Sequence, residues 1–193
     1  LAEGKKFVNY GGIGVGWALT SEEFMQNQAL FNNLKLKASY GSAGNAEIGD
    51  SYEALEQFGP QVYNGLPALV LVNLKKEQLS WETRQTLNVG VEFGLMKNRL
   101  SGSVEFYDAK TNGLYLNTLI SSTNAAGRVL TNLGKLQNRG IEVALSYDVV
   151  QTKDWIVNIY ANWTSNTSKV LALDGNDEII NGISINRVGE RAN

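Results

Sequence analysis

The chain of 193 residues contains no cysteine and no histidine. Without cysteine it cannot form disulfides or thiolate metal sites, and without histidine it cannot form imidazole metal sites. Ser-His and Cys-His catalytic pairs are excluded for the same reason. These absences remove the most common enzyme sites. We therefore expect no catalytic residues, no metal site and no cofactor.

Long apolar runs and a strong charge excess are also missing. No run approaches the ~18 apolar residues that a membrane helix needs, which excludes helical membrane spans. The formal net charge is -2, with 17 Lys and Arg against 19 Asp and Glu scattered along the chain. This distribution has no nucleic-acid footprint, and we expect no nucleic-acid partner.

The sequence does contain strict alternation of apolar and polar residues, which is clearest in residues 79–110. Apolar residues occupy every second position from Leu87 to Leu95, and the alternation resumes after residues 96–99, which predicts two strands and a tight turn. With Leu95 facing Leu100, the further pairs are Phe93 with Gly102, Val91 with Val104, Val89 with Phe106 and Glu92 with Ser103. Every pair is like with like, and a one-residue slip would destroy this agreement, so the register is well specified.

The same pattern predicts long strands at residues 11–19, 33–41, in both arms of 79–110, and at 140–148 and 155–164. Between the first two strands, Thr20 or Ser21 is expected to cap a short helical turn that runs to about Phe31. The segment 42–79 is too long for an ordinary connection, and with turn signals such as Asn64-Gly65 it is expected to be functional or a folded excursion. After Ser165 the chain is polar, and we expect a loop.

Short and long connections alternate strictly along the chain. The short ones are residues 20–33, 96–99 and 149–154, and the long ones are 42–82, 111–139 and the tail after 165. Because consecutive antiparallel strands reverse direction, all short turns lie at one end of the sheet. A soluble sandwich has no reason to show this, whereas an outer-membrane barrel has short periplasmic turns and long extracellular loops. The sequence predicts an all-β, antiparallel, up-and-down transmembrane β-barrel, with about six long strands present.

Two tryptophans test this prediction. Trp155 and Trp163 share a strand face and lie about 26 Å apart along a strand, or roughly 20 Å along the membrane normal after a ~40° tilt. This separation is close to the ~25 Å apolar band that aromatic girdles border in such barrels. The alternative is that both are core tryptophans of a soluble sheet.

Three longer strings carry a family resemblance: LKLKASYGSAGN (34–45), LSWETRQTLNVGVEFGLMKNRLSGSVEFYDAKT (79–111) and NLGKLQNRGIEVAL (132–145). In this order they closely resemble the late barrel of SusC/RagA-type TonB-dependent transporters of Bacteroidetes outer membranes. GIGVGWALTSEEF (12–24) is similar to the family's preceding strand and turn, and Val188-Gly189-Glu190 to its Val-Gly-Glu-Pro element. The chain departs from the family where Tyr10-Gly11-Gly12 stands in place of Phe-Pro-Ser, and where Arg191 stands in place of Pro.

The resemblance implies that residues 1–193 are part of one TonB-dependent receptor β-barrel domain in the outer membrane. A plug domain, a TonB-contacting segment and the remaining strands of a wall of about 22 strands are expected outside these residues. The implied function is import of oligosaccharides or peptides together with a SusD-like surface lipoprotein that lids the barrel, and the implied partners are this lipoprotein, TonB through the plug, outer-membrane lipid and the glycan or peptide substrate. Rival interpretations are a surface-exposed β-rich adhesion or structural protein, a TonB-dependent siderophore receptor, and an outer-membrane barrel enzyme with catalytic groups elsewhere.

The predicted ligand contacts lie in the first long loop and at its end. Tyr52, Phe58 and Tyr63 are the loop aromatics, and Trp81 at the extracellular start of a strand could stack a sugar ring or serve as a structural aromatic at the membrane edge. Val89, Val91, Phe93, Val104 and Phe106 are expected against lipid, and Glu92, Ser103 and Glu105 toward the lumen.

Charged and glycine-rich positions have non-catalytic interpretations. Glu92, Glu105 and Glu142 are interpreted as solvated or plug-contacting carboxylates rather than an acid-base pair. Lys35 and Lys37 could attract an anionic substrate or simply face water or the plug. The Gly12, Gly14 and Gly16 series lies inside a strand pattern, so it is interpreted as a packing feature and not as a phosphate loop.

Overall fold

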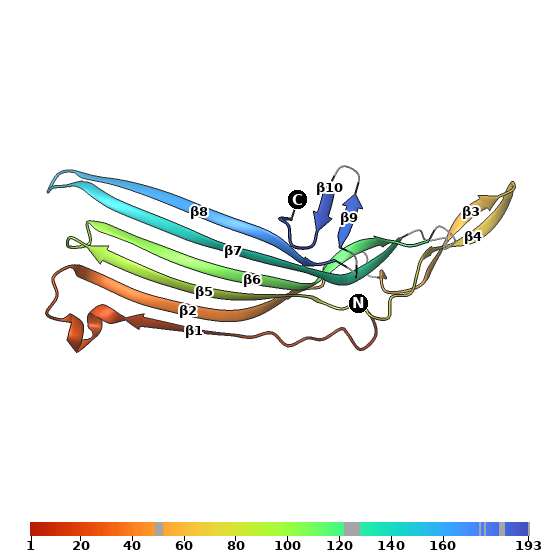
Figure 1. Cartoon of the computed structure of the whole chain (residues 1–193), viewed down its shortest axis with the longest axis horizontal. Coiled ribbons are helices and arrows are strands. Elements are labelled where there is room, and N and C mark those ends of the chain that lie inside the picture. Colours follow the sequence, from red (N-terminus) through yellow and green to blue (C-terminus); the bar gives the residue numbers. More distant parts are fainter. Residues whose placement is uncertain (49–51, 122–127, 174, 176, 182–183, 193) are drawn as a thin grey trace.

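The computed structural model describes residues 1–48, 52–121, 128–173, 175, 177–181 and 184–192, and its dominant feature is a six-stranded antiparallel sheet (Figure 1). The strands follow one another in the order β1 (Gly12–Ala18), β2 (Phe31–Asn45), β5 (Glu82–Leu95), β6 (Leu100–Leu119), β7 (Arg128–Gln151) and β8 (Ile156–Ala172). All five pairings in this sheet are between strands that are neighbours in this order, which is the up-and-down topology predicted from the alternation. Among the described residues, no helix has the length and apolarity to cross a bilayer.

The predicted register of the β5–β6 hairpin is confirmed at every pair. Leu95 faces Leu100, and the remaining pairs are Phe93 with Gly102, Val91 with Val104, Val89 with Phe106 and Glu92 with Ser103. The short turns lie together at one end of the sheet and the long connections at the other (Figure 1). By the asymmetry of outer-membrane barrels, the short-turn end is periplasmic and the other end is extracellular.

The strands extend further toward the extracellular end than predicted. Residues 111–139, expected as a long loop, instead continue β6 to Leu119 and begin β7 at Arg128. Likewise β8 continues to Ala172 where a loop was expected after Ser165, and a small hairpin of β9 (Glu178–Asn181) and β10 (Ser184–Arg187) follows. Both predictions were wrong because apolar and polar residues do not alternate strictly in these segments; apolar residues stand side by side at Leu114-Tyr115-Leu116, Val129-Leu130 and Val170-Leu171. The backbone ladder continues there without the hydrophobic contrast that marks a strand in sequence.

The expected capped helical turn is also wrong. Residues Leu19–Ser21 (η1) and Glu23–Met25 (η2) form two 3-10 turns, and neither has a side-chain cap. The candidate cap Thr20 instead accepts a hydrogen bond from the backbone N–H of Leu34 at 3.4 Å. Glu22 accepts a hydrogen bond from the indole N–H of Trp17 at 2.8 Å. Both polar side chains are therefore committed to neighbouring strands.

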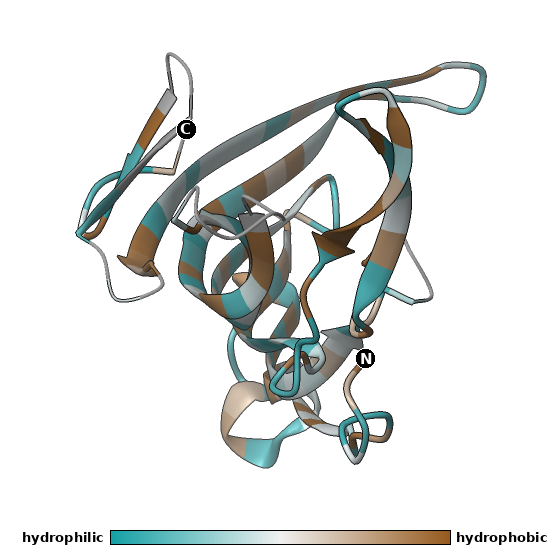
Figure 2. Cartoon of the chain, turned by 90° about the vertical axis from the view of Figure 1, so that its right-hand side faces the viewer, coloured by the Kyte–Doolittle hydropathy of each residue, from teal (hydrophilic) through white to brown (hydrophobic). Residues whose placement is uncertain are grey.

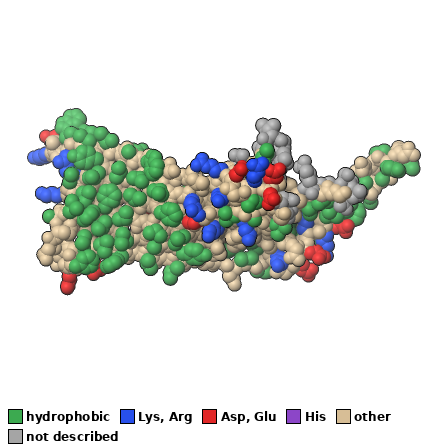
Figure 3. All heavy atoms as spheres, in the orientation of Figure 1, with side chains coloured by type: hydrophobic (Ala, Val, Ile, Leu, Met, Phe, Trp, Pro, Cys, Tyr) green, Lys and Arg blue, Asp and Glu red, His purple; other side chains and the backbone are tan. Residues whose placement is uncertain are grey.

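One face of the sheet carries a continuous apolar band. The alternation is visible as successive hydrophobic and hydrophilic segments along the strands (Figure 2). By register, the apolar side chains of this outer face are Ile13, Val15, Trp17, Leu34, Leu36, Ala38, Tyr40, Leu87, Val89, Val91, Phe93, Leu95, Leu100, Val104, Phe106, Ile141, Val143, Leu145, Tyr147, Val157, Ile159, Ala161 and Trp163. Apolar side chains cover the part of this face toward the short turns, and charged side chains gather beyond it (Figure 3). The residues expected against lipid all belong to this band.

The band is staggered across the strands, as barrel closure requires. Its extracellular border lies at Tyr40 on β2, whose register row runs through Leu87, Asp108 and Arg139 to Thr167 on β8. On β8, however, the apolar series already ends at Trp163, which lies four residues before Thr167. A tilt of ~40° with strands ~4.8 Å apart displaces the border by about 1.2 residues per strand, or about five residues over the four steps from β2 to β8. The observed displacement fits a tilted barrel wall and not a flat sheet.

The two predicted girdle tryptophans lie at opposite ends of this band. Trp163 closes the apolar series of β8, and Trp155 lies in the short turn before β8, where its backbone and that of Thr152 are hydrogen-bonded at 2.8 Å. In the described residues β1 and β8 do not pair with each other, so the sheet is an open part of a wall. Unpaired strand edges cannot lie in lipid, so these two edges require further strands.

Val104 and Ser103 are neighbours on β6 and lie on opposite faces of the sheet, so they provide a matched test of which face meets lipid. In the full-length protein, Val104→Arg places a cation near the middle of the lipid-facing band and is expected to destabilise the barrel in vesicles by about 2–4 kcal/mol. Ser103→Arg, one residue away on the lumen face and opposite Glu92, is expected to cost little. Urea unfolding of both variants in lipid vesicles measures the difference. Equal costs for the two variants would contradict the assignment of faces.

Candidate functional site

The first long loop folds into a separate β-hairpin that projects from the extracellular end (Figure 1). Among the described strands, β3 (Gln57–Tyr63) and β4 (Leu66–Asn73) pair only with each other. Their turn is Asn64-Gly65, with φ of 49° and 76°, and positive φ at both positions is the signature of the tight turn that matches strand twist. The predicted folded excursion and its turn signal are thus confirmed.

The surface of this hairpin is apolar and uncharged. No Asp, Glu, Lys or Arg occurs between Gln57 and Asn73, and Val62, Leu66 and Leu69 are 71%, 68% and 74% exposed. Exposed apolar surfaces of this kind commonly mark contact sites for other proteins or ligands.

The edges of the hairpin are protected by the only two prolines of the chain, Pro60 and Pro67. A two-residue turn makes Tyr63 and Leu66 the hydrogen-bonded closing pair, so Pro67 and Pro60 fall in non-hydrogen-bonded pairs. Their nitrogens therefore point toward the free edges, where proline cannot donate a hydrogen bond. Addition of a further strand is disfavoured, and the hairpin presents its faces for contact rather than its edges.

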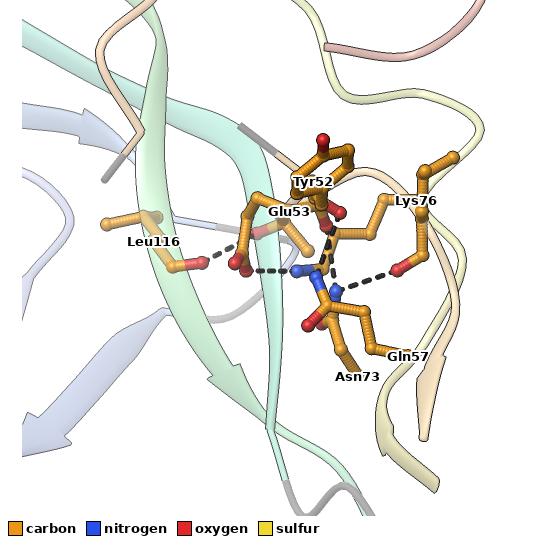
Figure 4. Close-up of polar contacts among 8 residues, drawn as sticks. Tyr52, Glu53, Gln57, Asn73, Lys76 and Leu116 are labelled. Atoms are coloured by element: carbon orange, nitrogen blue, oxygen red, sulfur yellow. Dashed lines mark hydrogen bonds and ion pairs between the residues drawn. The ribbon is translucent and has the colours of Figure 1, made fainter. Parts of the chain in front are cut away.

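A polar cluster fixes the base of the hairpin (Figure 4). The side-chain amide of Asn73 donates to the backbone carbonyls of Glu53 and Leu55, both at 2.9 Å. Lys76 forms an ion pair with the Glu53 carboxylate, and its side chain is only 4% exposed. Gln57 donates to the carbonyl of Tyr52 at 3.0 Å. A buried lysine with its partner removed is costly, so this cluster holds the hairpin in one orientation.

Beneath the hairpin, a small apolar core ties the loop to the extracellular ends of β6 and β7. Leu79 is 2% exposed and is buried with Ala2 and Ala54. Partly buried hydrophobics, Ile48, Tyr115 and Leu130, pack against this cluster.

Ser80, next to Leu79, accepts hydrogen bonds from side chains of both β6 and β7. Its carbonyl accepts from the Tyr115 hydroxyl at 2.8 Å and from the Asn132 amide at 3.0 Å. Burial raises the pKa of the Tyr115 phenol, which lies beyond the apolar band, so this hydroxyl stays a donor at physiological pH. The loop is therefore anchored to both long strands.

The predicted ligand-contact residues do not converge on one pocket. Phe58 and Tyr63 lie on the hairpin, 61% and 78% exposed, and Tyr52 lies near its base, 65% exposed. Trp81 lies at the extracellular end as predicted, but it is engaged by the protein. Its indole N–H donates to the Lys6 carbonyl at 3.2 Å, and its ring meets Tyr10 edge-on at 5.9 Å. This arrangement matches the structural alternative for Trp81.

The lumen face carries an ion-pair network. Lys37 on β2 pairs with Glu92 at 2.8 Å and also with Glu105, two strands away on β6. The strand between them presents Gly90, where a Cβ would lie 3.1 Å from Lys37 Cε and 3.0 Å from Glu105 Cγ. The missing side chain thus lets the lysine cross β5. The interpretation of Lys37 as simply facing water or the plug was incomplete, because these partners could not be seen in the sequence.

The other residues singled out on this face are less constrained. Glu142 is exposed and faces Glu105 in the register. Lys35 lies over Gly16, where a Cβ would be 3.2 Å from its Cε, so this glycine has the packing role expected of the series. In the described residues there is no group of three or more His, Cys, Asp or Glu able to hold a metal ion.

One cavity was missed by sequence reasoning. It has a volume of about 280 Å³ and lies between residues 75–79 of the loop and residues 129–133 of β7. Its size is at the lower end of small-molecule sites, so it fits one side chain or ring of a larger ligand. No sequence signal could have located it, since residues 129–133 fell in the expected loop.

Comparison with protein families places this geometry among known proteins. Residues 6–191 match the family described as TonB dependent receptor-like, beta-barrel. Similar curated proteins are TonB-dependent receptor P26 of Formosa agariphila, 33% identical over 183 residues (93% of this chain, 18% of the relative), and TonB-dependent receptor SusC of Bacteroides thetaiotaomicron, 28% identical over 178 residues (86% and 17%). The chain therefore spans about a fifth of the length of these relatives.

Solved structures agree with the sequence matches. The chain superposes on the RagAB peptide transporter with a TM-score of 0.82 at 27% identity, covering 93% of this chain and 20% of that one. For the RagAB peptide importer in the 'open-open' state the TM-score is 0.80 at 27% identity, covering 94% and 20%.

The packed base of the loop generates a stability prediction. Leu79→Ala in the full-length receptor removes the most buried large side chain of this region and is expected to cost about 2–5 kcal/mol of local stability. Protease added to intact cells should then cut residues 52–81 faster than in the parent protein. Leu66→Ala, at a position 68% exposed, is the control and should leave the rate unchanged. Equal cleavage of Leu79→Ala and the parent protein would show that the core does not hold the loop.

Proposed function

The chain belongs to the TonB-dependent receptor-like β-barrel family, and from this premise we propose that the whole protein imports oligosaccharides or peptides across the outer membrane. The family match over residues 6–191 carries the proposal, because it covers nearly the whole sheet. Residues 1–193 then form part of one barrel domain. The plug, the TonB-contacting segment and the other wall strands belong to the remainder of the receptor, and transport is driven by TonB acting on the plug.

Each part of the chain has a distinct role in this proposal. The apolar outer face meets lipid, and the polar face with the Lys37 network lines the lumen beside the plug. The extracellular loops, anchored by Leu79 and Ser80, meet substrate and partner. No bond is made or broken, and the curated relatives are likewise described as receptors.

The proposed partner is a SusD-like surface lipoprotein that lids the barrel. Proteins similar to this chain include SusC and the RagAB peptide transporter. The uncharged β3–β4 hairpin supports the proposal, since it reaches farthest from the membrane band and keeps large apolar side chains in water (Figure 1). Burying a valine or leucine is worth about 1.5–3 kcal/mol, so a contact there would contribute substantially to binding.

Growth tests the import function. Deletion of the gene is expected to abolish growth on one glycan or peptide from a panel of sole nutrients, and to leave growth on simple sugars unchanged. Complementation with the full-length gene should restore it. Undiminished growth on every complex nutrient of the panel, with the protein expressed in the parent strain, would contradict the proposal.

A charged hairpin tests the lipoprotein contact. Val62→Asp combined with Leu69→Asp is expected to reduce copurification of the SusD-like lipoprotein with the tagged receptor by at least about tenfold, because a charge in an apolar contact costs more than 1.4 kcal/mol. Asn64→Asp adds charge to the same hairpin at its turn and keeps a residue that tolerates positive φ, so it serves as the control and should copurify normally. Normal recovery with the double variant would exclude the hairpin as the contact.

A further inference from the structure

A group of five cations lies on the outer face of the wall, just beyond the extracellular border of the apolar band. They are Lys110 on β6, Lys135 and Arg139 on β7, Lys169 on β8, and Arg191 in the segment that returns to β8. All five are exposed. Figure 3 shows Lys and Arg gathered past the hydrophobic part of this face. We refer to these five residues as the basic patch.

The register brings the basic patch together around one buried side chain. Lys110, Gln137 and Lys169 lie in one row across three strands, and Lys169 also pairs with Arg191. Gln137 is 7% exposed, and its amide donates to both Asp108 oxygens at 2.8 and 2.9 Å. Residues separated by more than twenty positions in sequence thus form one surface.

The patch keeps a large excess of positive charge. Asp108 is its one acidic member in the register rows of the described strands, and Arg139 approaches it only to 3.8 Å. The neighbouring Glu178 and Glu190 are both engaged by Arg187, at 2.8 and 3.1 Å. The patch therefore has five cations and one carboxylate beside an apolar surface. This excess positive charge must be solvated by water or balanced by an anionic ligand.

The patch begins at the depth of the lipid headgroup layer and extends outward from it. Arg139 lies two residues beyond the apolar Ile141, Lys110 lies four beyond Phe106, and Lys135 and Lys169 lie six beyond Ile141 and Trp163. With a rise of ~3.4 Å and a tilt of ~40°, Arg139 and Lys110 lie about 5–10 Å outside the hydrocarbon, and Lys135 and Lys169 about 16 Å. The headgroup region extends about 5–8 Å beyond the hydrocarbon on each side.

We propose that the basic patch binds the phosphate-bearing glycolipid of the outer leaflet, lipopolysaccharide, through its lipid A headgroup. Arg139 and Arg191 offer forked donors that suit phosphate oxygens, and the lysines add point charges. Phe106, Ile141 and Trp163 continue the surface below, where the acyl chains lie. Other occupants fit less well. The patch faces away from the lumen, and a symmetric contact with a second receptor would place this positive surface against itself.

The experiment uses the full-length receptor purified in detergent and exchanged into phosphatidylcholine nanodiscs doped with lipid A. Native mass spectrometry measures how much lipid A stays bound. The patch variant combines Lys110→Gln, Arg139→Gln, Lys169→Gln and Arg191→Gln. The control variant neutralises the same number of cations elsewhere, with Lys35→Gln, Lys75→Gln, Lys97→Gln and Lys153→Gln. Dephosphorylated lipid A and free inorganic phosphate complete the comparison.

We expect the parent protein and the control variant to retain lipid A, and the patch variant to lose at least about tenfold in retention. Retention should fall with added salt, since exposed charges are screened, and dephosphorylated lipid A should bind weakly. Equal retention by the patch variant, or equal binding of dephosphorylated lipid A, would overturn the proposal. Displacement by millimolar inorganic phosphate would assign the patch to free phosphate and would also overturn it. If the patch variant does not assemble, the single variants Lys169→Gln and Arg139→Gln are measured in its place. If lipid A retention depends on salt in both single variants as it does in the parent protein, the proposal is rejected.

Discussion

The structure depends on one constraint: within lipid every backbone N–H and C=O must find a partner inside the protein. The antiparallel ladder from β1 to β8 meets it between neighbouring strands and leaves the outer edges of β1 and β8 to be paired by further strands; the other features follow. The ladder fixes which residues share a row, the two-residue alternation fixes which face each residue takes, and the strand tilt shifts the apolar border from Tyr40 on β2 to Trp163 on β8. The face that meets lipid and the face that lines the lumen are thus two consequences of one hydrogen-bond pattern.

The ladder also explains what sequence reasoning could reach. Inside the membrane band, the two faces of the sheet differ strongly in hydrophobicity, so the β5–β6 register was predicted pair by pair from Leu95 and Leu100 outward. Outside the band neither face meets lipid, and β6 and β7 continue through residues 111–119 and 128–139 without strict alternation of apolar and polar residues. Composition there resembles a loop although the backbone is a strand. The cap expected at Thr20 failed for a different reason, since that hydroxyl bonds the neighbouring strand.

The candidate site was less predictable because it depends on which strands are neighbours. Tyr52, Phe58, Tyr63 and Trp81 were found by their type and by their place in or beside a long loop, but only the structure shows that they are dispersed and that Trp81 packs on Tyr10. Lys37 reaches Glu105 only because Gly90 stands between them. The basic patch has the same origin, since Lys110, Gln137 and Lys169 meet solely through register. Arg191 stands where the family's Val-Gly-Glu-Pro element has proline, and in the structure it pairs with Lys169.

The central claim is that one face of this sheet meets lipid and the other meets the aqueous lumen. The absence of cysteine makes a spin-label scan direct: single cysteines are placed at Ser101 and at each position of β6 from Ser103 to Tyr107, in a full-length receptor whose other cysteines, if present, are replaced. Gly102 is left unchanged because a Cβ there would lie 2.5 Å from the Ala144 carbonyl oxygen. Collision with lipid-soluble oxygen and with a water-soluble nickel complex is then measured in vesicles. The account predicts strict alternation, with oxygen contact highest at Val104 and Phe106, and nickel contact highest at Ser101, Ser103, Glu105 and Tyr107. Uniform contact with the nickel complex along the strand would contradict a membrane wall.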